Sequence, residues 1–194
     1  TGTVSGAGAN AGMKLLANGA SSSATSTLKI QSVFSTTYKC YKLIGRFQPA
    51  TLGADMEGRF LDGSTATTAS EYRYICHNAY KSSSDAQQGA NGGWSSSFWR
   101  WNRFGLQNAS AFGYYIEANI WNPMASSTSQ GGDDQMITSI GTGYTNGNYV
   151  ETTQVSVNYQ LGGDMDGIQI NFNPGDISEH WYAVYGVNLE WQDT

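Results

Sequence analysis

The feature that most constrains the fold is an alternation of apolar and polar residues near the C-terminal end. Residues 168, 170 and 172 are apolar, and Gln169 and Asn171 lie between them. After a turn segment that contains Pro174, the alternation resumes over residues 181–191, where Trp, Ala, Tyr, Val, Leu and Trp share one face. A period of two residues is typical of a strand with one buried face. The apolar face of the last strand needs a covering layer, which predicts a second sheet or a closed barrel.

The rest of the chain favours a single all-β domain. Its 194 residues include 24 Gly, 12 Tyr and 6 Trp but only 13% charged residues, a composition of strands and turns. The alternation and the spacing of turn residues predict a two-sheet β-sandwich of jelly-roll type over residues 27–194. The expected strands are 28–34, 38–47, 54–61, 72–80, 98–104, 112–121, 136–144, 150–161, 167–172 and 181–191.

Residues 1–26 have a different composition. They are mostly Gly, Ala, Ser, Thr and Asn, with one apolar island at Met13, Leu15 and Leu16. Such a stretch buries too little apolar surface to hold itself in place. We therefore expect an extended N-terminal arm that docks on another subunit or another protein.

The charge of the chain argues against several classes of partner. A net charge of −5 does not suit binding to DNA or RNA through phosphates. All ten Lys and Arg lie at or before Arg103, but the strands of the two halves of a sandwich usually interleave, so we expect this asymmetry to be lost in space. No apolar run is long enough to span a membrane and no signal-peptide pattern is present, which predicts a soluble chain without membrane insertion.

Several strand motifs, taken in order, resemble a family of virus proteins. The motifs are Leu28-Lys-Ile-Gln-Ser-Val-Phe, Tyr38-Lys-Cys-Tyr-Lys-Leu-Ile-Gly-Arg-Phe, Tyr114-Tyr-Ile-Glu-Ala-Asn-Ile-Trp-Asn-Pro, Gly167-Ile-Gln-Ile-Asn-Phe and Val184-Tyr-Gly-Val. This plan is similar to that of small tail-associated or virion structural β-sandwich proteins of tailed bacteriophages, marine ones especially. The resemblance implies a place in the virus particle, without specifying which place.

A Trp-rich window is the candidate binding site. It contains Trp94, Trp99, Arg100, Trp101 and Arg103. In one interpretation the rings stack on sugar rings of a bacterial surface glycan, and the arginines hydrogen-bond hydroxyls or pair with acidic groups. In the other, which we favour, the window is a central strand with aromatic side chains in both layers.

Four glutamates within expected strands raise the question of an enzyme. Jelly-roll glycosidases use a pair of carboxylates in a cleft. Here Glu57 and Glu117 alternate with apolar neighbours, so we expect them on outer faces in solvent; Glu151 and Glu190 are the other two. We therefore predict no catalytic residues.

The remaining chemistry-bearing residues also indicate no reactive centre. His77 and His180 lie in no triad or nucleophile-elbow setting, and with Cys40 and Cys76 they form no zinc pattern. The two cysteines are expected as buried thiols, with a single bridge left open. Acidic turns at 131–134 and 163–167 lack the full calcium-loop pattern, so no metal or cofactor is expected.

The leading hypothesis is a non-enzymatic structural protein of the phage virion, associated with the tail or a tail fibre and contributing to particle assembly and host attachment. A capsid decoration protein of the head is the close alternative, and a carbohydrate-binding module or glycoside hydrolase is an alternative of a different class. The expected partners are other virion proteins, a host surface glycan and further copies of the chain in a homo-oligomer, for which a trimer is the simplest guess.

Overall fold

The protein is all-β and has two sheets. The structure, a computed structural model, describes residues 12–81, 86–109, 112–125, 135–160 and 163–188, and this part of the chain contains thirteen strands and no helix. The large sheet has the order β1 (Gly12–Ser21), β13 (Ile177–Asn188), β3 (Cys40–Pro49), β9 (Tyr114–Trp121), β10 (Gln135–Tyr144), β11 (Val150–Tyr159), β6 (Tyr72–Lys81) and β7 (Ala86–Ser96). The small sheet has the order β2 (Leu28–Ile30), β12 (Gly167–Asn173), β4 (Asp55–Asp62) and β5 (Thr65–Ala66), and β8 (Trp99–Arg100) also pairs with β4.

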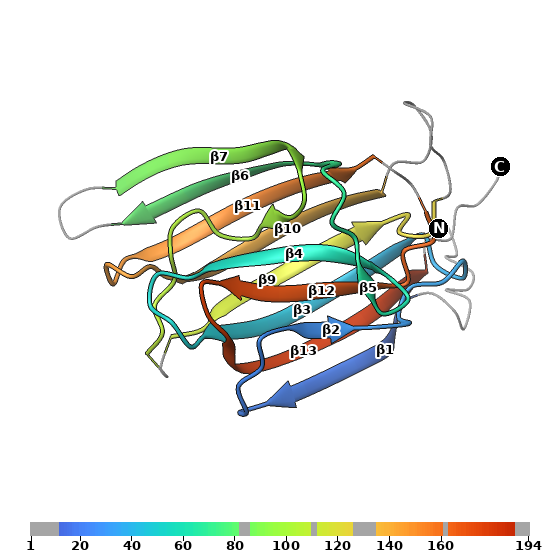
Figure 1. Cartoon of the computed structure of the whole chain (residues 1–194), viewed down its shortest axis with the longest axis horizontal. Coiled ribbons are helices and arrows are strands. Elements are labelled where there is room, and N and C mark those ends of the chain that lie inside the picture. Colours follow the sequence, from blue (N-terminus) through green and yellow to red (C-terminus); the bar gives the residue numbers. More distant parts are fainter. Residues whose placement is uncertain (1–11, 82–85, 110–111, 126–134, 161–162, 189–194) are drawn as a thin grey trace, which may run out of the picture.

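The small sheet lies over one face of the large sheet, and their facing side chains form the core (Figure 1). The alternation predicted for residues 168–172 is confirmed, because Ile168, Ile170 and Phe172 point inward from β12. Met56 and Phe60 point inward from β4 in the same way. The large sheet contributes inward side chains from six of its strands, among them Leu43, Ile116, Ile137, Val155, Tyr72 and Val184.

The last strand, β13, buries the face opposite to the one expected. Val184 is buried, whereas Trp181 on the opposite face is 39% exposed. The face that carries Trp181, Ala183, Tyr185 and Val187 is therefore the outer face of the large sheet, not the core face. Alternation could not decide between the two faces, because Tyr182 and Val184 make the other face apolar as well.

The segment expected as an extended arm is partly a strand. Residues 12–21 form β1, which pairs with β13 from Gly12↔Asn188 to Ser21↔His180, and the ladder contains one irregularity between Leu15 and Ala17. Main-chain hydrogen bonds to β13 hold this strand, although its side chains bury little surface. Residues 12–21 are thus an edge strand of the large sheet, and residues 1–11 lie outside the described part.

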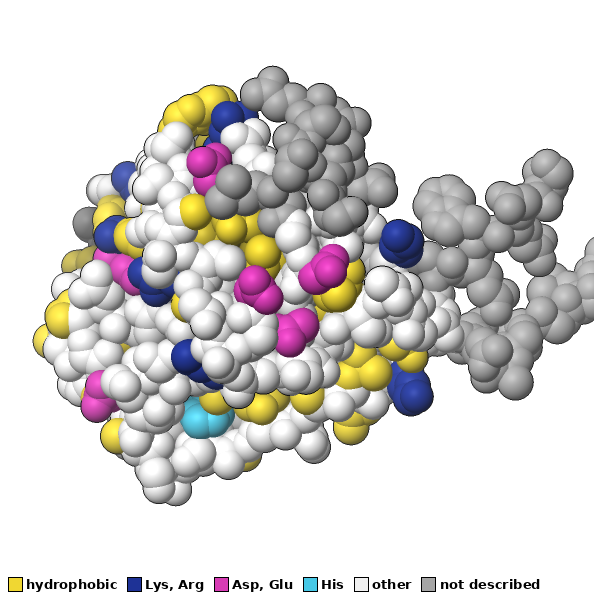
Figure 2. All heavy atoms as spheres, turned by 45° about the vertical axis from the view of Figure 1, so that its right-hand side comes forward, with side chains coloured by type: hydrophobic (Ala, Val, Ile, Leu, Met, Phe, Trp, Pro, Cys, Tyr) yellow, Lys and Arg dark blue, Asp and Glu magenta, His cyan; other side chains and the backbone are white. Residues whose placement is uncertain are grey.

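The two halves of the sequence interleave in space, as expected. β13 lies between β1 and β3, and β9, β10 and β11 lie between β3 and β6. Figure 2 shows both basic and acidic side chains on the face in view. Among the described residues, no helix is long and apolar enough to cross a membrane.

Candidate functional site

Trp99, in the Trp-rich window, lies inside the core. Its side chain is 0% exposed, and its ring packs 5.4 Å from that of Phe60 and 5.2 Å from that of Tyr72. It pairs with Gly58 of β4, where a Cβ atom would lie 2.3 Å from the indole, so only glycine admits the ring there. A ring in this position cannot stack on a glycan.

Trp101 is equally buried and connects the two sheets. Its backbone N–H donates to the Met56 carbonyl on β4 at 2.9 Å. Its backbone carbonyl accepts hydrogen bonds from the hydroxyls of Tyr114 on β9 at 2.7 Å and Thr153 on β11 at 3.0 Å. Trp99 and Trp101 are therefore core residues, as in the interpretation that we favour, although only Trp99–Arg100 of the expected strand 98–104 form a strand, β8. Residues 99–101 thus connect the small sheet to the large sheet.

The other three residues of the proposed platform do not form one surface. Trp94 is 75% exposed, and the Arg73 guanidinium lies 3.9 Å from the centre of its ring. Arg100 pairs with Asp55 at 2.9 Å. Arg103 donates to the Asn78 side chain at 3.0 Å. Both arginines are thus engaged within the chain.

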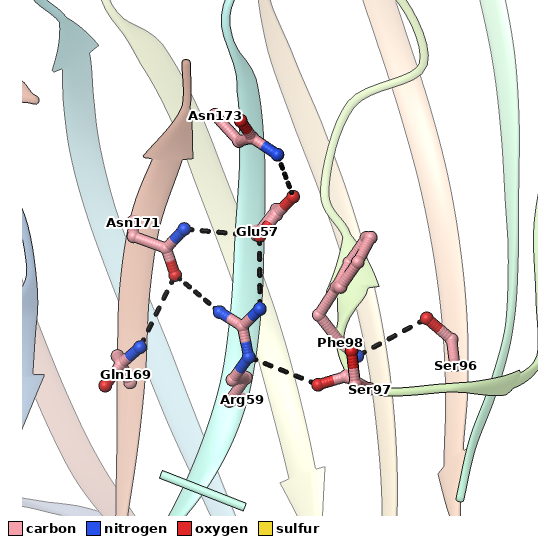
Figure 3. Close-up of polar contacts among 8 residues, drawn as sticks. All are labelled: Glu57, Arg59, Ser96, Ser97, Phe98, Gln169, Asn171 and Asn173. Carbon is pink, nitrogen blue, oxygen red and sulfur yellow. Dashed lines mark hydrogen bonds and ion pairs between the residues drawn. The ribbon is translucent and has the colours of Figure 1, made fainter. Parts of the chain in front are cut away.

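A polar network covers the outer face of the small sheet (Figure 3). Glu57 is 2% exposed, which corrects the expectation that it lies in solvent. Its carboxylate accepts hydrogen bonds from Asn171 at 3.2 Å and Asn173 at 3.1 Å, and Arg59 lies 3.4 Å away. Arg59 also donates to Asn171 at 2.9 Å and to the Ser97 carbonyl at 3.2 Å. The network joins β4 to β12 and to the segment before β8, so its role is structural.

Replacing Glu57 with alanine is expected to lower the free energy of unfolding by about 2 kcal/mol, because the largely buried Arg59 guanidinium and the amides of Asn171 and Asn173 lose their partner. Urea denaturation monitored by fluorescence measures the change. Glu117→Ala is the matched control, since Glu117 pairs with Lys42 at 2.6 Å with its side chain 56% exposed, and its loss should be below about 1 kcal/mol. Equal losses in the two variants would contradict the role of the network.

Glu151 lies in a third environment, fully buried on the inner face of β11. Asn78 donates to its Oε1 atom at 3.0 Å. Burial raises the pKa of this carboxyl to about 7, against the opposing effect of the Arg103 and Phe104 backbone N–H groups and the Asn78 amide. Glu57, Glu117 and Glu151 thus lie on two opposite outer faces and in the interior, so no two of them share a cleft. Glu190 lies outside the described residues.

The two histidines and two cysteines form no metal-binding group in the described part of the chain. Both cysteines are free and buried, and burial raises the pKa of Cys40 to about 11 and that of Cys76 to about 12, so the thiols stay protonated and unreactive at neutral pH. Burial lowers the pKa of His180. Within the described ranges no group of three His, Cys, Asp or Glu side chains could hold a metal ion.

The outer face of the large sheet, on the far side in Figure 1, gathers most of the exposed large apolar side chains of the described residues. Exposed large apolar side chains gathered on one face of a sheet are typical of a binding face. The side chains are Met13, Leu15, Ile75, Tyr115, Met136, Ile140, Tyr144, Val150 and Trp181.

Two hollows lie side by side on this face. The first, of about 620 Å³, has Trp181 and Tyr115 at one side, their ring centres 6.5 Å apart and their planes inclined at 64°. The second, of about 790 Å³, lies over β6, β7 and β11 and includes His77 and Ala90. Both are lined by Gln154, where they meet. Together we call them the cross-strand groove.

The groove combines aromatic rings with hydroxyl and amide groups, and Glu117 and His77 also line it. Sequence reasoning did not find it, because Trp181 and Tyr115 are 66 positions apart and only the pairing of β13, β3 and β9 brings them together. Comparisons with protein-family models, with curated protein sequences and with solved structures find no match.

Proposed function

We propose that the protein is a non-enzymatic structural component of a tailed-bacteriophage particle, associated with the tail or a tail fibre, that takes part in host attachment. Its two sheets would form a sandwich of jelly-roll type. The observation that carries the attachment role is the outer face of the large sheet, where exposed apolar side chains surround the cross-strand groove. An uncovered apolar face on a rigid scaffold needs a ligand or a partner.

The phage assignment is supported by the strand motifs that resemble virion proteins. These motifs lie on β2, β3, β9, β12 and β13 and the residues that flank them, in both sheets of the fold. The motifs are thus distributed along the whole domain and are not confined to one local site. A resemblance that extends over the whole domain suits a structural role in the particle.

The non-enzymatic assignment is supported by the positions of the carboxylates. Glu57 is held by two amides and an arginine, Glu117 is paired with Lys42, and Glu151 is enclosed in the core. A glycosidase needs two carboxyl groups that face one sugar ring from a shared cleft. Glu57, Glu117 and Glu151 do not meet that requirement.

The test is labelling of intact phage particles with an antibody against this chain, viewed by electron microscopy. We expect label at the tail or its fibres. Label spread over the head would instead make the chain a capsid decoration protein, and particles without label would overturn the virion assignment. A particle lacking the chain, labelled in parallel, is the control.

A further inference from the structure

We propose that the cross-strand groove binds an uncharged polysaccharide chain laid across the strands of the large sheet. This inference rests on the proposed attachment role and names the class of ligand for that face. It moves the glycan site from the Trp-rich window, where Trp99 and Trp101 are buried, to the outer face of the large sheet.

The length of the groove fits an oligosaccharide and not a single sugar. It extends from Trp181 on β13 to Ala90 on β7, and β3, β9, β10, β11 and β6 lie between these strands. Six strand spacings of about 4.8 Å give a span of about 29 Å. A ligand that uses both hollows must therefore be an extended chain.

The polar side chains that line the groove are suited to hydroxyl groups. The side chains of Asn119, Thr152 and Gln154 make no hydrogen bond to any other described residue. Amides and hydroxyls both donate and accept, as sugar hydroxyls do. Gln154 lies where the two hollows meet, so its amide is placed to contact the middle of a bound chain.

The charges of the groove favour an uncharged glycan over an acidic one. Glu117 and His77 are the titratable side chains in its described lining, and Glu117 is neutralised by Lys42 at 2.6 Å. The two arginines that the sequence suggested for acidic sugars, Arg100 and Arg103, are held by Asp55 and Asn78 away from this face. No free cationic side chain of the described lining is left to pair with a carboxylate or sulfate.

The aromatic pair provides the apolar part of recognition. Tyr115 is 47% and Trp181 39% exposed, so both rings present surface to solvent at one end of the groove. Sugar rings have apolar faces that stack on such rings. A protein partner, including a second copy of the chain, would also use exposed aromatic side chains, so the experiment must separate the two.

The experiment measures binding of the purified full chain to neutral hexasaccharides of glucan, mannan and galactan type, with uronate hexasaccharides for comparison, by isothermal titration calorimetry. We expect binding to at least one neutral hexasaccharide and a loss of tenfold or more in affinity for Trp181→Ala and for Tyr115→Ala. Trp94→Ala, which removes an exposed tryptophan outside the groove lining, should change affinity less than twofold. Unchanged circular dichroism spectra confirm that the variants are folded.

A second variant tests the span of the groove. Gln154→Ala should weaken binding of the hexasaccharide by severalfold but leave a disaccharide at the aromatic end unaffected. Equal loss for both lengths would overturn the extended binding mode. So would absence of binding to every neutral hexasaccharide, preference for the uronates, or a self-associated chain that Trp181→Ala dissociates in a sedimentation experiment.

The outcomes separate this inference from the proposed function. Glycan binding by the purified chain does not depend on where the chain lies in a particle. Label at the tail without glycan binding would overturn the inference alone, whereas glycan binding without label on particles would overturn the virion assignment alone.

Discussion

Replacing Trp99 with alanine is expected to lower the free energy of unfolding by about 3–5 kcal/mol. The side chain is fully buried and packs against Phe60, Tyr72 and Trp101. Its removal leaves a cavity that Gly58 cannot fill, because glycine has no side chain to move into it. Urea denaturation followed by circular dichroism measures the loss.

Two further variants serve as controls for the Trp99→Ala result. Trp94→Ala should change stability by less than about 0.5 kcal/mol, because its ring is 75% exposed. Trp99→Phe should cost less than Trp99→Ala, since it keeps an aromatic ring and removes an indole N–H that has no hydrogen-bond partner among the described residues. If Trp99→Ala were as stable as Trp94→Ala, the window would not be core and its role as a surface would have to be reconsidered.

The internal strands of the fold could be predicted from the sequence because their two faces differ. Buried residues alternate with more exposed ones along β10 and β11, and β12 buries Ile168, Ile170 and Phe172 on its inner face. The predicted and observed ranges of these three strands agree closely. β1 and β7 were missed. Both are edge strands of the large sheet, rich in Gly, Ala, Asn and Gln, and are held mainly by main-chain hydrogen bonds to a single neighbour. A pattern based on apolar side chains gives no signal for such strands.

The side-chain environments were harder to predict than the strands. Alternation correctly placed Glu57 on the face opposite Met56. The expectation that a residue on the outer face is exposed to solvent did not hold, because polar neighbours on β12 bury Glu57 there. Glu151 is different, because it has the same parity as Val155 and Val157 and the sequence therefore contained the signal that it points inward. The groove required the strand order, which no local pattern provides.

The inward position of Glu151 has a consequence for the effect of pH on stability. Its pKa is about 7 in the folded chain, compared with an ordinary value of 4.5. Below about pH 4.5 the carboxyl is protonated in both folded and unfolded chains, so its ionisation costs nothing. Between about pH 4.5 and 7 the unfolded chain ionises while the folded chain retains the proton, so the free energy of unfolding falls as pH rises, by about 3 kcal/mol in total.

Glu151→Gln is therefore expected to be more stable than the unmodified protein at pH 8, by up to about 3 kcal/mol, and similar to it at pH 4. Glutamine keeps an acceptor for the Asn78 amide, and its other polar atom takes the place of Oε2, which has no hydrogen-bond partner among the described residues. Denaturation curves at pH 4, 6 and 8 measure the difference, with Glu117→Gln as the control whose difference should stay below about 1 kcal/mol. A difference between Glu151→Gln and the unmodified protein that does not vary with pH would show that Glu151 ionises in the folded chain as it does in the unfolded one. Water would then have to reach the carboxylate, which is 0% exposed in the folded chain.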